Sequence, residues 1–166
     1  MTRQINMLIS ETPILTDQAL KHFTEANPEA GAIVSFSGHV RADKDNGGTQ
    51  ALFLQAYEPM TQNMIEKKRQ DALRQWGLND ALILHRTGHM TPGDAIVFVA
   101  TAAAHRRDAF EAADYLMDYL KTEAFFWKKE IGKTGAKWVE PKETDYQDAK
   151  RWADISDNSA LLDKDK

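Results

Sequence analysis

The feature that most constrains this chain is a helical pattern of apolar residues that stops at a cluster of aromatic and charged residues. The pattern runs from about Arg106 to Glu123, and its apolar positions recur at helical spacing: Phe110, Ala113, Met117 and Leu120. This spacing predicts one long helix with a buried face. From Phe125 the sequence reads Phe-Phe-Trp-Lys-Lys-Glu, which predicts that the helix ends there and that a strand follows.

Three lysines stand at this transition. Lys121 falls in the last turn of the predicted helix, and Lys128 and Lys129 follow on the strand. Because neighbouring aromatic side chains exclude water, they lower the pKa of a lysine ammonium, which suits it to proton transfer or anion capture. The alternative is that Lys121 complements the helix dipole and that the other two lie on an exposed strand. Spacing alone favours this second interpretation.

The rest of the chain alternates between shorter strand and helix patterns. Strands are predicted over 4–10, 31–40, 51–57, 80–88 and 95–103, helices over 17–24 and 60–76, and a hairpin over 125–131 and 137–140. This order predicts an α+β domain with a mainly antiparallel sheet, packed helices and a C-terminal β-hairpin. We expect a single domain over residues 1–152 and a frayed polar tail over 153–166.

The composition excludes several classes of function. The 166 residues carry a net charge of −4 and a pI near 5.7, whereas a general nucleic-acid binder needs a clustered basic face. There is no cysteine, which removes disulfides, thiolate metal sites and a thiol nucleophile. No apolar run approaches the roughly 18 residues of a membrane span, and the N-terminus lacks a signal-peptide core. We therefore expect a cytoplasmic protein that binds neither nucleic acid nor membrane.

The start of the long helix has the chemistry of an anion site. His105, Arg106 and Arg107 stand where a strand gives way to this helix, so free amide groups and two guanidinium groups meet there. The alternative is an ordinary exposed first turn. His105 and Lys121 are sixteen residues apart, which is about 24 Å along a helix. If both act on one small anion, the site must be shared across a symmetric dimer; otherwise one of them is structural.

A second strand end is also a candidate. His39, Val40 and Arg41 end a strand and begin a polar, glycine-containing loop that continues to Thr49. Such a loop either closes over a substrate or is a surface connection, and the sequence does not decide between them. No metal site is predicted, because Gly88 and the strand pattern argue against a helical pair of histidines in this part of the chain.

Several short motifs resemble one family in order and spacing. They are Gly31-Ala-Ile-Val-Ser-Phe-Ser-Gly-His-Val-Arg41, His85-Arg-Thr-Gly88, Pro92-Gly-Asp94, Ala104-His-Arg106, Met117-Asp-Tyr-Leu-Lys-Thr122, Phe126-Trp-Lys128 and Trp138-Val-Glu140. Together they resemble the large, catalytic subunits of molybdopterin synthase, over roughly residues 5–152.

The resemblance implies an α/β-hammerhead-type fold and a homodimer that binds a small ubiquitin-like sulfur-carrier subunit at each end, giving a heterotetramer. It implies a sulfurtransferase of molybdenum cofactor biosynthesis that converts cyclic pyranopterin monophosphate into the molybdopterin dithiolene. The sulfur would arrive as the thiocarboxylate of the carrier's Gly-Gly C-terminus, so no separate cofactor is expected. The alternative is a non-catalytic dimeric module that binds an anionic pterin or nucleotide.

The resemblance also implies a role for each candidate residue. Lys121 would act at the thiocarboxylate, and Lys128 would orient the pterin and its phosphate. The remaining substrate contacts would be Lys129 and Glu130 on the adjoining edge, His39, Val40 and Arg41 at the strand end, and His105 and Arg106 from the neighbouring subunit.

Overall fold

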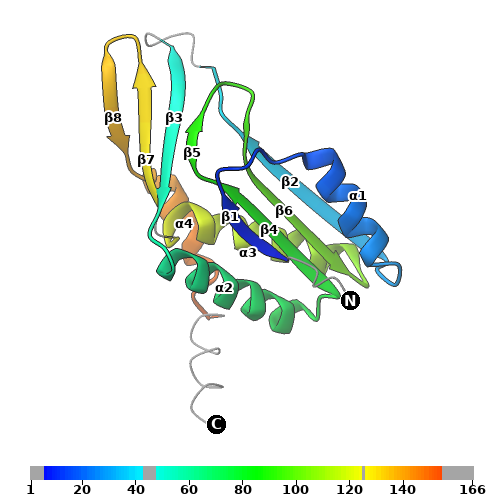
Figure 1. Cartoon of the computed structure of the whole chain (residues 1–166). Coiled ribbons are helices and arrows are strands. Elements are labelled where there is room, and N and C mark those ends of the chain that lie inside the picture. The colour runs from blue at the N-terminus through cyan, green and yellow to red at the C-terminus, as the bar shows by residue number, and fades with distance from the viewer. Residues whose placement is uncertain (1–5, 43–47, 125, 155–166) are drawn as a thin grey trace.

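The computed structural model describes residues 6–42, 48–124 and 126–154. Within them four helices and eight strands form two four-stranded sheets (Figure 1): sheet A in the order β1-β4-β6-β2 and sheet B in the order β5-β3-β7-β8. In chain order the elements are β1 (Met7–Ser10), α1 (Thr16–Ala26), β2 (Ala32–His39), β3 (Thr49–Ala56), α2 (Met60–Trp76), β4 (Asp80–Arg86), β5 (Gly88–Met90), β6 (Ala95–Ala103), α3 (Arg106–Thr122), β7 (Phe126–Gly132), β8 (Gly135–Val139) and α4 (Glu143–Lys150).

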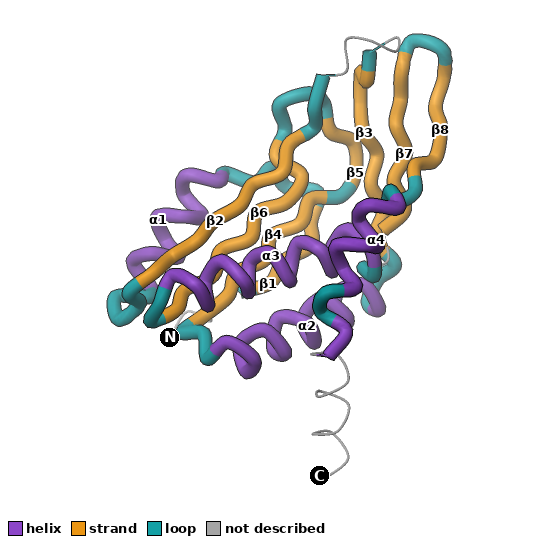
Figure 2. Tube along the Cα trace, turned by 180° about the vertical axis from the view of Figure 1, so that it is seen from behind, coloured by secondary structure: helices purple, strands orange, loops and turns teal. Residues whose placement is uncertain are grey.

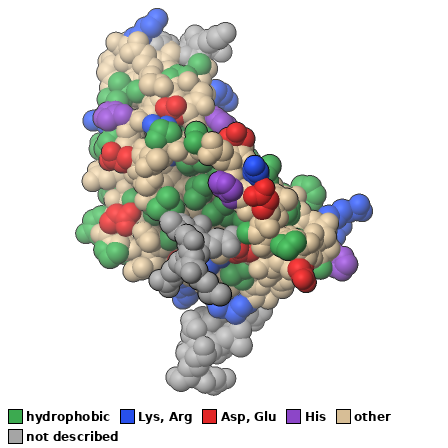
Figure 3. Space-filling model, turned by 45° about the vertical axis from the view of Figure 1, so that its right-hand side comes forward, with side chains coloured by type: hydrophobic (Ala, Val, Ile, Leu, Met, Phe, Trp, Pro, Cys, Tyr) green, Lys and Arg blue, Asp and Glu red, His purple; other side chains and the backbone are tan. Residues whose placement is uncertain are grey.

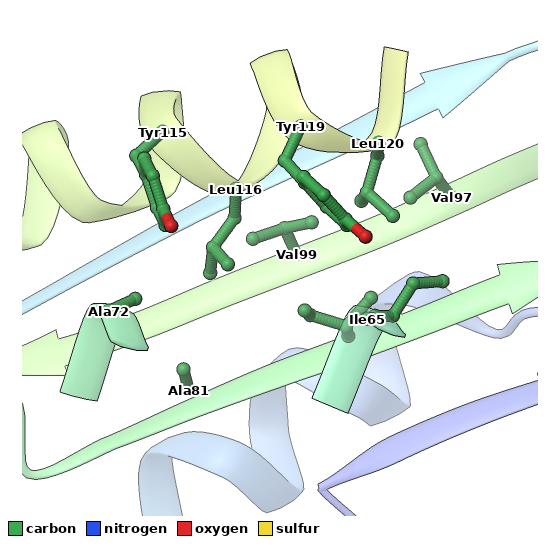
Figure 4. Close-up of a cluster of buried hydrophobic side chains, with 10 residues drawn as sticks. Ile65, Ala72, Ala81, Val97, Val99, Tyr115, Leu116, Tyr119 and Leu120 are labelled. Carbon is green, nitrogen blue, oxygen red and sulfur yellow. The ribbon is translucent and has the colours of Figure 1, made fainter. Parts of the chain in front are cut away.

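Sheet A holds most of the buried core because helices cover both of its faces. Along its central strand β6, Val97 and Val99 point towards α2 and α3, while Phe98 and Ala100 point towards α1. Figure 2 shows α2 and α3 lying across one face of this sheet. Figure 4 shows Leu116 of α3 directed onto β6 between the two helices. The position of α3 is therefore fixed by packing along most of its length.

The buried face of α3 differs from the predicted one at Phe110. Its buried positions are Ala109, Ala112, Ala113, Tyr115, Leu116, Tyr119 and Leu120. Phe110 lies outside this stripe, and 62% of its surface is exposed. The prediction that Phe110 faces the core is therefore wrong, because the buried stripe of the helix runs through Ala109, Ala112 and Leu116 instead.

The α+β class and the mainly antiparallel pairing are confirmed, with β1 and β4 as the one parallel pair among the described strands. The predicted strand over 80–88 instead ends at Arg86. Gly88 has a positive φ of 78°, a conformation that glycine adopts without strain, and there the chain crosses from sheet A into β5 of sheet B.

Sheet B is covered on one face only. Leu52 and Leu54 of β3 and Met90 of β5 form a small buried cluster with Val40. The opposite face of the β7–β8 hairpin is open, and residues 135–138 of the edge strand β8 are all exposed. Sheet B is thus anchored to the body of the molecule along its inner face.

Helix α4 was not predicted from the sequence. It packs against the C-terminal half of α3 through Arg151, whose guanidinium lies 2.8 Å from Asp118 and 2.9 Å from Asp114. Trp152 donates to the same Asp118 carboxylate at 2.7 Å. Most of the predicted tail (155–166) and the centre of the predicted loop (43–47) lie outside the described residues.

Candidate functional site

The structure brings Lys121 and Lys128 together at one end of α3. Lys121 is exposed in the last turn of the helix. Lys128 is half-buried on β7, where it pairs with Leu54 of β3 and Val139 of β8. Directly opposite residues of antiparallel strands share a face, so Lys128 extends from the inner face of sheet B, beside the buried cluster.

Burial and positive neighbours lower the pKa of Lys128 below its ordinary value. Desolvation is the largest cause, followed by the nearby ammonium of Lys121. Lys142 lowers this pKa further, whereas Glu130 and Asp145 oppose the shift. An ammonium with a lowered pKa gives up its proton more readily, so Lys128 suits proton transfer. The two positive charges together suit the stabilisation of developing negative charge.

Two of the contributors to this cluster, Lys142 and Asp145, were not predicted. Both belong to the start of α4, where the Lys142 backbone N–H donates to Asp145 Oδ2 at 2.8 Å. The sequence carried a weak signal for them, because Pro141 followed by the acidic residues of a first turn is typical of a helix start.

Strand alternation divides the candidates on β7 between two faces. Glu130 pairs with Leu52 and shares the inner face with Lys128. Lys129 points the other way, and its ammonium lies 5.3 Å from the ring centroid of Trp138 on the outer face. The structure therefore groups Glu130 with the lysine pair and does not bring Lys129 to it.

The end of β2 is held rigidly up to Arg41. His39 hydrogen-bonds through Nδ1 to the carbonyl of Gly93 at 3.1 Å and through Nε2 to Ser37 Oγ at 3.0 Å. The Val40 N–H donates to the carbonyl of Asp94 at 2.9 Å, and its side chain is buried in the cluster of sheet B. Val40 thus holds the end of β2 in place, while the next residue, Arg41, is exposed to solvent.

The start of α3 carries the second group of candidates. His105 is the N-cap residue but forms no side-chain cap hydrogen bond, so the first-turn amides keep their capacity to bind an anion. Arg106 is exposed and borders a shallow hollow of about 260 Å³ with Arg107 and Phe110. Arg107 is paired with Glu111 at 3.4 Å, whereas no carboxylate partner of Arg106 is seen among the described residues.

The two groups lie at opposite ends of one subunit. In the β2–β6 register Ala32 pairs with Ala103, next to His105, whereas His39 pairs with Ala95 at the far end of the strands. Helix α3 returns antiparallel to β6, which brings Lys121 back towards the His39 end. Arg41, Lys121 and Lys128 therefore share one end, about 24 Å of helix away from His105.

His85 is a buried neighbour of the lysine end. Burial lowers its pKa to about 4, so the imidazole is neutral near pH 7. It stacks on Phe126 with 4.0 Å between ring centroids and thereby connects β4 to the start of β7. In the part of the chain that the structure describes, no group of three or more histidine or acidic residues could hold a metal ion.

The surface chemistry is mixed. On the face shown in Figure 3, basic and acidic side chains are interspersed with hydrophobic ones, and no continuous basic area appears there. Among the described residues no helix is long and apolar enough to cross a membrane. Helix α3 therefore carries positive charge at both ends. The end with Lys121 is crowded and partly desolvated by its neighbours, whereas the end with His105 and Arg106 is exposed.

Comparisons with known proteins agree with one another. Residues 9–123 match the family described as MoaE protein. A molybdopterin synthase catalytic subunit from Caulobacter vibrioides is 47% identical over 144 residues, which are 87% of this chain and 95% of that protein. The MoaE protein of Burkholderia ambifaria has a solved structure with a TM-score of 0.75 and 39% identity, covering 90% of this chain and 98% of that one.

A further solved structure shares the fold at lower identity. It is a complex of subunits 1 and 2 of the molybdopterin-converting factor from Helicobacter pylori, with a TM-score of 0.69 and 24% identity. The match covers 82% of this chain and 90% of that one.

Proposed function

This chain belongs to the MoaE family and is an enzyme of molybdenum cofactor biosynthesis, and we propose how its residues transfer sulfur from a thiocarboxylated carrier to cyclic pyranopterin monophosphate. The observation that carries the proposal is the crowded lysine end of α3, where Lys121 and burial lower the pKa of Lys128. This arrangement suits chemistry at a carbonyl better than simple anion binding, which favours the enzyme over a non-catalytic module. The reaction would take place in the cytoplasm.

In this proposal each transfer breaks the C–S bond of the carrier's thiocarboxylate. The sulfur forms a new C–S bond to a carbon of the pterin side chain. At one carbon this bond replaces the C–O bond to the cyclic phosphate, which opens to a monoester, and at the other it replaces a C–O bond whose oxygen leaves as water. The carrier leaves with an ordinary carboxylate whose new oxygen comes from water.

Lys121 stabilises the negative charge that develops at the carbonyl oxygen. Lys128 orients the pterin and can exchange a proton because its pKa is lowered, and Glu130 stays beside it on the same strand face. The sulfur comes from the carrier, so the chain itself supplies no cofactor.

The free edge of sheet A supports a homodimer. β2 is an end strand of that sheet, and residues 32–38 contain no charged residue and no proline, the usual protections of an exposed edge. Phe36 on this strand is 45% exposed, and Phe110 on the neighbouring helix α3 is also exposed. An unprotected edge next to exposed phenylalanines is suited to pairing with a second copy.

Such pairing would join the two cationic ends into one site. In an antiparallel pair related by a twofold axis, the His39 end of one β2 lies beside the Ala32 end of the other. Because Ala32 pairs with Ala103, two residues before His105, the partner subunit's His105 and Arg106 would approach Arg41. A phosphate could then be held by guanidinium groups from two subunits while the pterin reaches Lys121 and Lys128.

A single-turnover assay tests the proposed reaction. The chain is mixed with the thiocarboxylated ubiquitin-like carrier of the same organism and with cyclic pyranopterin monophosphate, and sulfur-containing pterin is followed by mass spectrometry. We expect product with the thiocarboxylated carrier and none with the same carrier ending in an ordinary carboxylate. Substrate that binds but stays unchanged in both samples would contradict the proposal and favour the binding module.

A further inference from the structure

The turn between β5 and β6, residues 91–94, lies beside the end of β2 and holds it in place (Figure 1). The Gly93 N–H donates to the Val40 carbonyl at 2.8 Å, and the Val40 N–H donates to the Asp94 carbonyl at 2.9 Å. His39 hydrogen-bonds through Nδ1 to the carbonyl of Gly93 at 3.1 Å. Three hydrogen bonds therefore join the end of β2 to this turn, directly before Arg41.

The shape of the turn depends on the carboxylate of Asp94. Its Oδ2 accepts the Thr91 backbone N–H at 2.8 Å and the Thr91 hydroxyl at 3.3 Å. The Asp94 N–H donates in return to the Thr91 carbonyl at 3.0 Å. The hydrogen bond from the Thr91 amide lowers the pKa of this carboxyl below its ordinary value, so Asp94 is ionised near pH 7. The two ends of the turn are thus tied together by main-chain and side-chain hydrogen bonds.

Arg86 ties the same carboxylate to the rest of the molecule. Its Nη1 lies 3.4 Å from Asp94 Oδ2, and its side chain is 12% exposed. Its Nη2 donates to the His89 carbonyl at 3.4 Å. Arg86 belongs to β4 of sheet A and His89 to β5 of sheet B. Loss of one partner of a largely buried ion pair leaves the other charge without compensation, so Asp94 fixes the turn relative to both sheets.

A fixed backbone matters for a long side chain that has to bind an anion. An arginine loses rotamer freedom when it grips a phosphate, and an anchored backbone leaves less freedom to be lost on binding. Arg41 is exposed and directly follows the anchored end of β2. The Asp94 carboxylate is engaged by Thr91 and Arg86, and its negative charge repels a phosphate. Asp94 can therefore favour substrate binding only through the end of β2.

We propose that Asp94 is a positioning residue: its carboxylate sets the shape of the 91–94 turn, and the turn presents Arg41 to the substrate phosphate. The inference rests on the proposed function, in which Arg41 binds that phosphate. Asp94 itself does not touch the substrate and takes no part in the chemistry at the lysine end.

A double-mutant cycle tests this assignment by comparing the wild type, Asp94→Ala, Arg41→Ala and the double variant. Calorimetry measures the dissociation constant of cyclic pyranopterin monophosphate, and turnover is measured at saturating substrate with the thiocarboxylated carrier. Asp94→Asn keeps an acceptor oxygen for the Thr91 N–H and removes the charge, so it replaces Asp94→Ala in the cycle if that variant does not fold. The matched control is Glu25→Ala, an exposed carboxylate of α1 in a loose 4.0 Å pair with Lys21. Circular dichroism checks that each variant folds.

We expect Asp94→Ala to weaken substrate binding about tenfold and to leave the saturated rate within about twofold of the wild type, because a binding contact is displaced while the lysine end is intact. On the Arg41→Ala background the same change should cause no further loss, and Glu25→Ala should match the wild type. The inference is overturned if the folded Asp94 variant binds as tightly as the wild type, or if it weakens binding equally with and without Arg41. If Arg41→Ala itself binds as tightly as the wild type, the phosphate contact of the proposed function is contradicted and the inference falls with it.

Discussion

The two ends of α3 carry the same sign of charge in opposite surroundings. At the C-terminal end, Lys121 stands beside the half-buried Lys128, whose pKa is lowered by burial and by that neighbour. At the N-terminal end, His105 and Arg106 are exposed beside an open hollow. A crowded lysine can change its protonation state during a reaction, whereas an arginine stays charged and can only bind.

This difference assigns the two ends separate tasks. The lysine end is suited to chemistry at a carbonyl, and the arginine end is suited to holding a phosphate. The packing of α3 on sheet A keeps the two ends apart. In the proposed dimer, a second copy would bring both tasks to one substrate. Each substitution below changes one end and leaves the other intact.

The largest effect is expected from Lys121→Ala. Loss of one charged group that stabilises an oxyanion lowers the rate by about 10²- to 10³-fold, while an exposed position costs less than about 0.5 kcal/mol of unfolding free energy. Single-turnover kinetics and thermal unfolding measure the two quantities. The control is Lys21→Ala, an exposed lysine whose contact is a loose 4.0 Å pair with Glu25. A rate within threefold of the wild type would contradict the role of the lysine end.

A smaller effect of a different kind is expected from Arg106→Ala. It should raise KM for the pterin phosphate by about tenfold and leave the rate at saturation nearly unchanged, because a binding contact is lost. Arg107→Ala is the matched control, since this adjacent arginine is already paired with Glu111. A large fall in the saturated rate for Arg106→Ala would show that this end takes part in the chemistry.

The smallest effect is expected from Lys142→Gln. Removing this positive neighbour should raise the pKa of Lys128 towards the ordinary lysine value, because Lys142 is one of the charges that lower it. The alkaline limb of the pH–rate profile should then move to higher pH, provided that protonated Lys128 is the active form. NMR titration of the Lys128 ammonium measures the pKa directly. An unchanged or lowered value would mean that Lys142 does not act on this site.

The sequence predicted best those elements whose pattern is set by burial. β6 matches its predicted range of 95–103 because it is apolar along its length, with helices on both sides. Helix α2 also matches, from Met60 to Trp76. The short strand β5 and helix α4 were missed, because three residues carry no periodicity and because α4 has no buried residue to mark a face.

The sequence named the residues at both ends of α3 but not how they are arranged. The sixteen-residue spacing on one helix was enough to predict that His105 and Lys121 lie far apart. Lys129 lies on the outer face of sheet B, opposite to Lys128 and Glu130. The sequence shows that neighbouring residues alternate, but only the register of β7 against β3 shows which of them face inwards. Lys142 lies near Lys128 because α4 packs against the body of the molecule. This is a tertiary contact, which a local sequence pattern cannot predict.

In the proposed dimer, one site uses the two ends of α3 from different subunits. Lys121→Ala and Arg106→Ala chains can be co-expressed with different tags, and the mixed dimers isolated by two affinity steps. In a shared-site dimer one of the two sites then receives both intact residues, so we expect about half of wild-type activity at low substrate concentration. Activity no higher than the mean of the two parent variants would contradict the account and confine each site to a single chain.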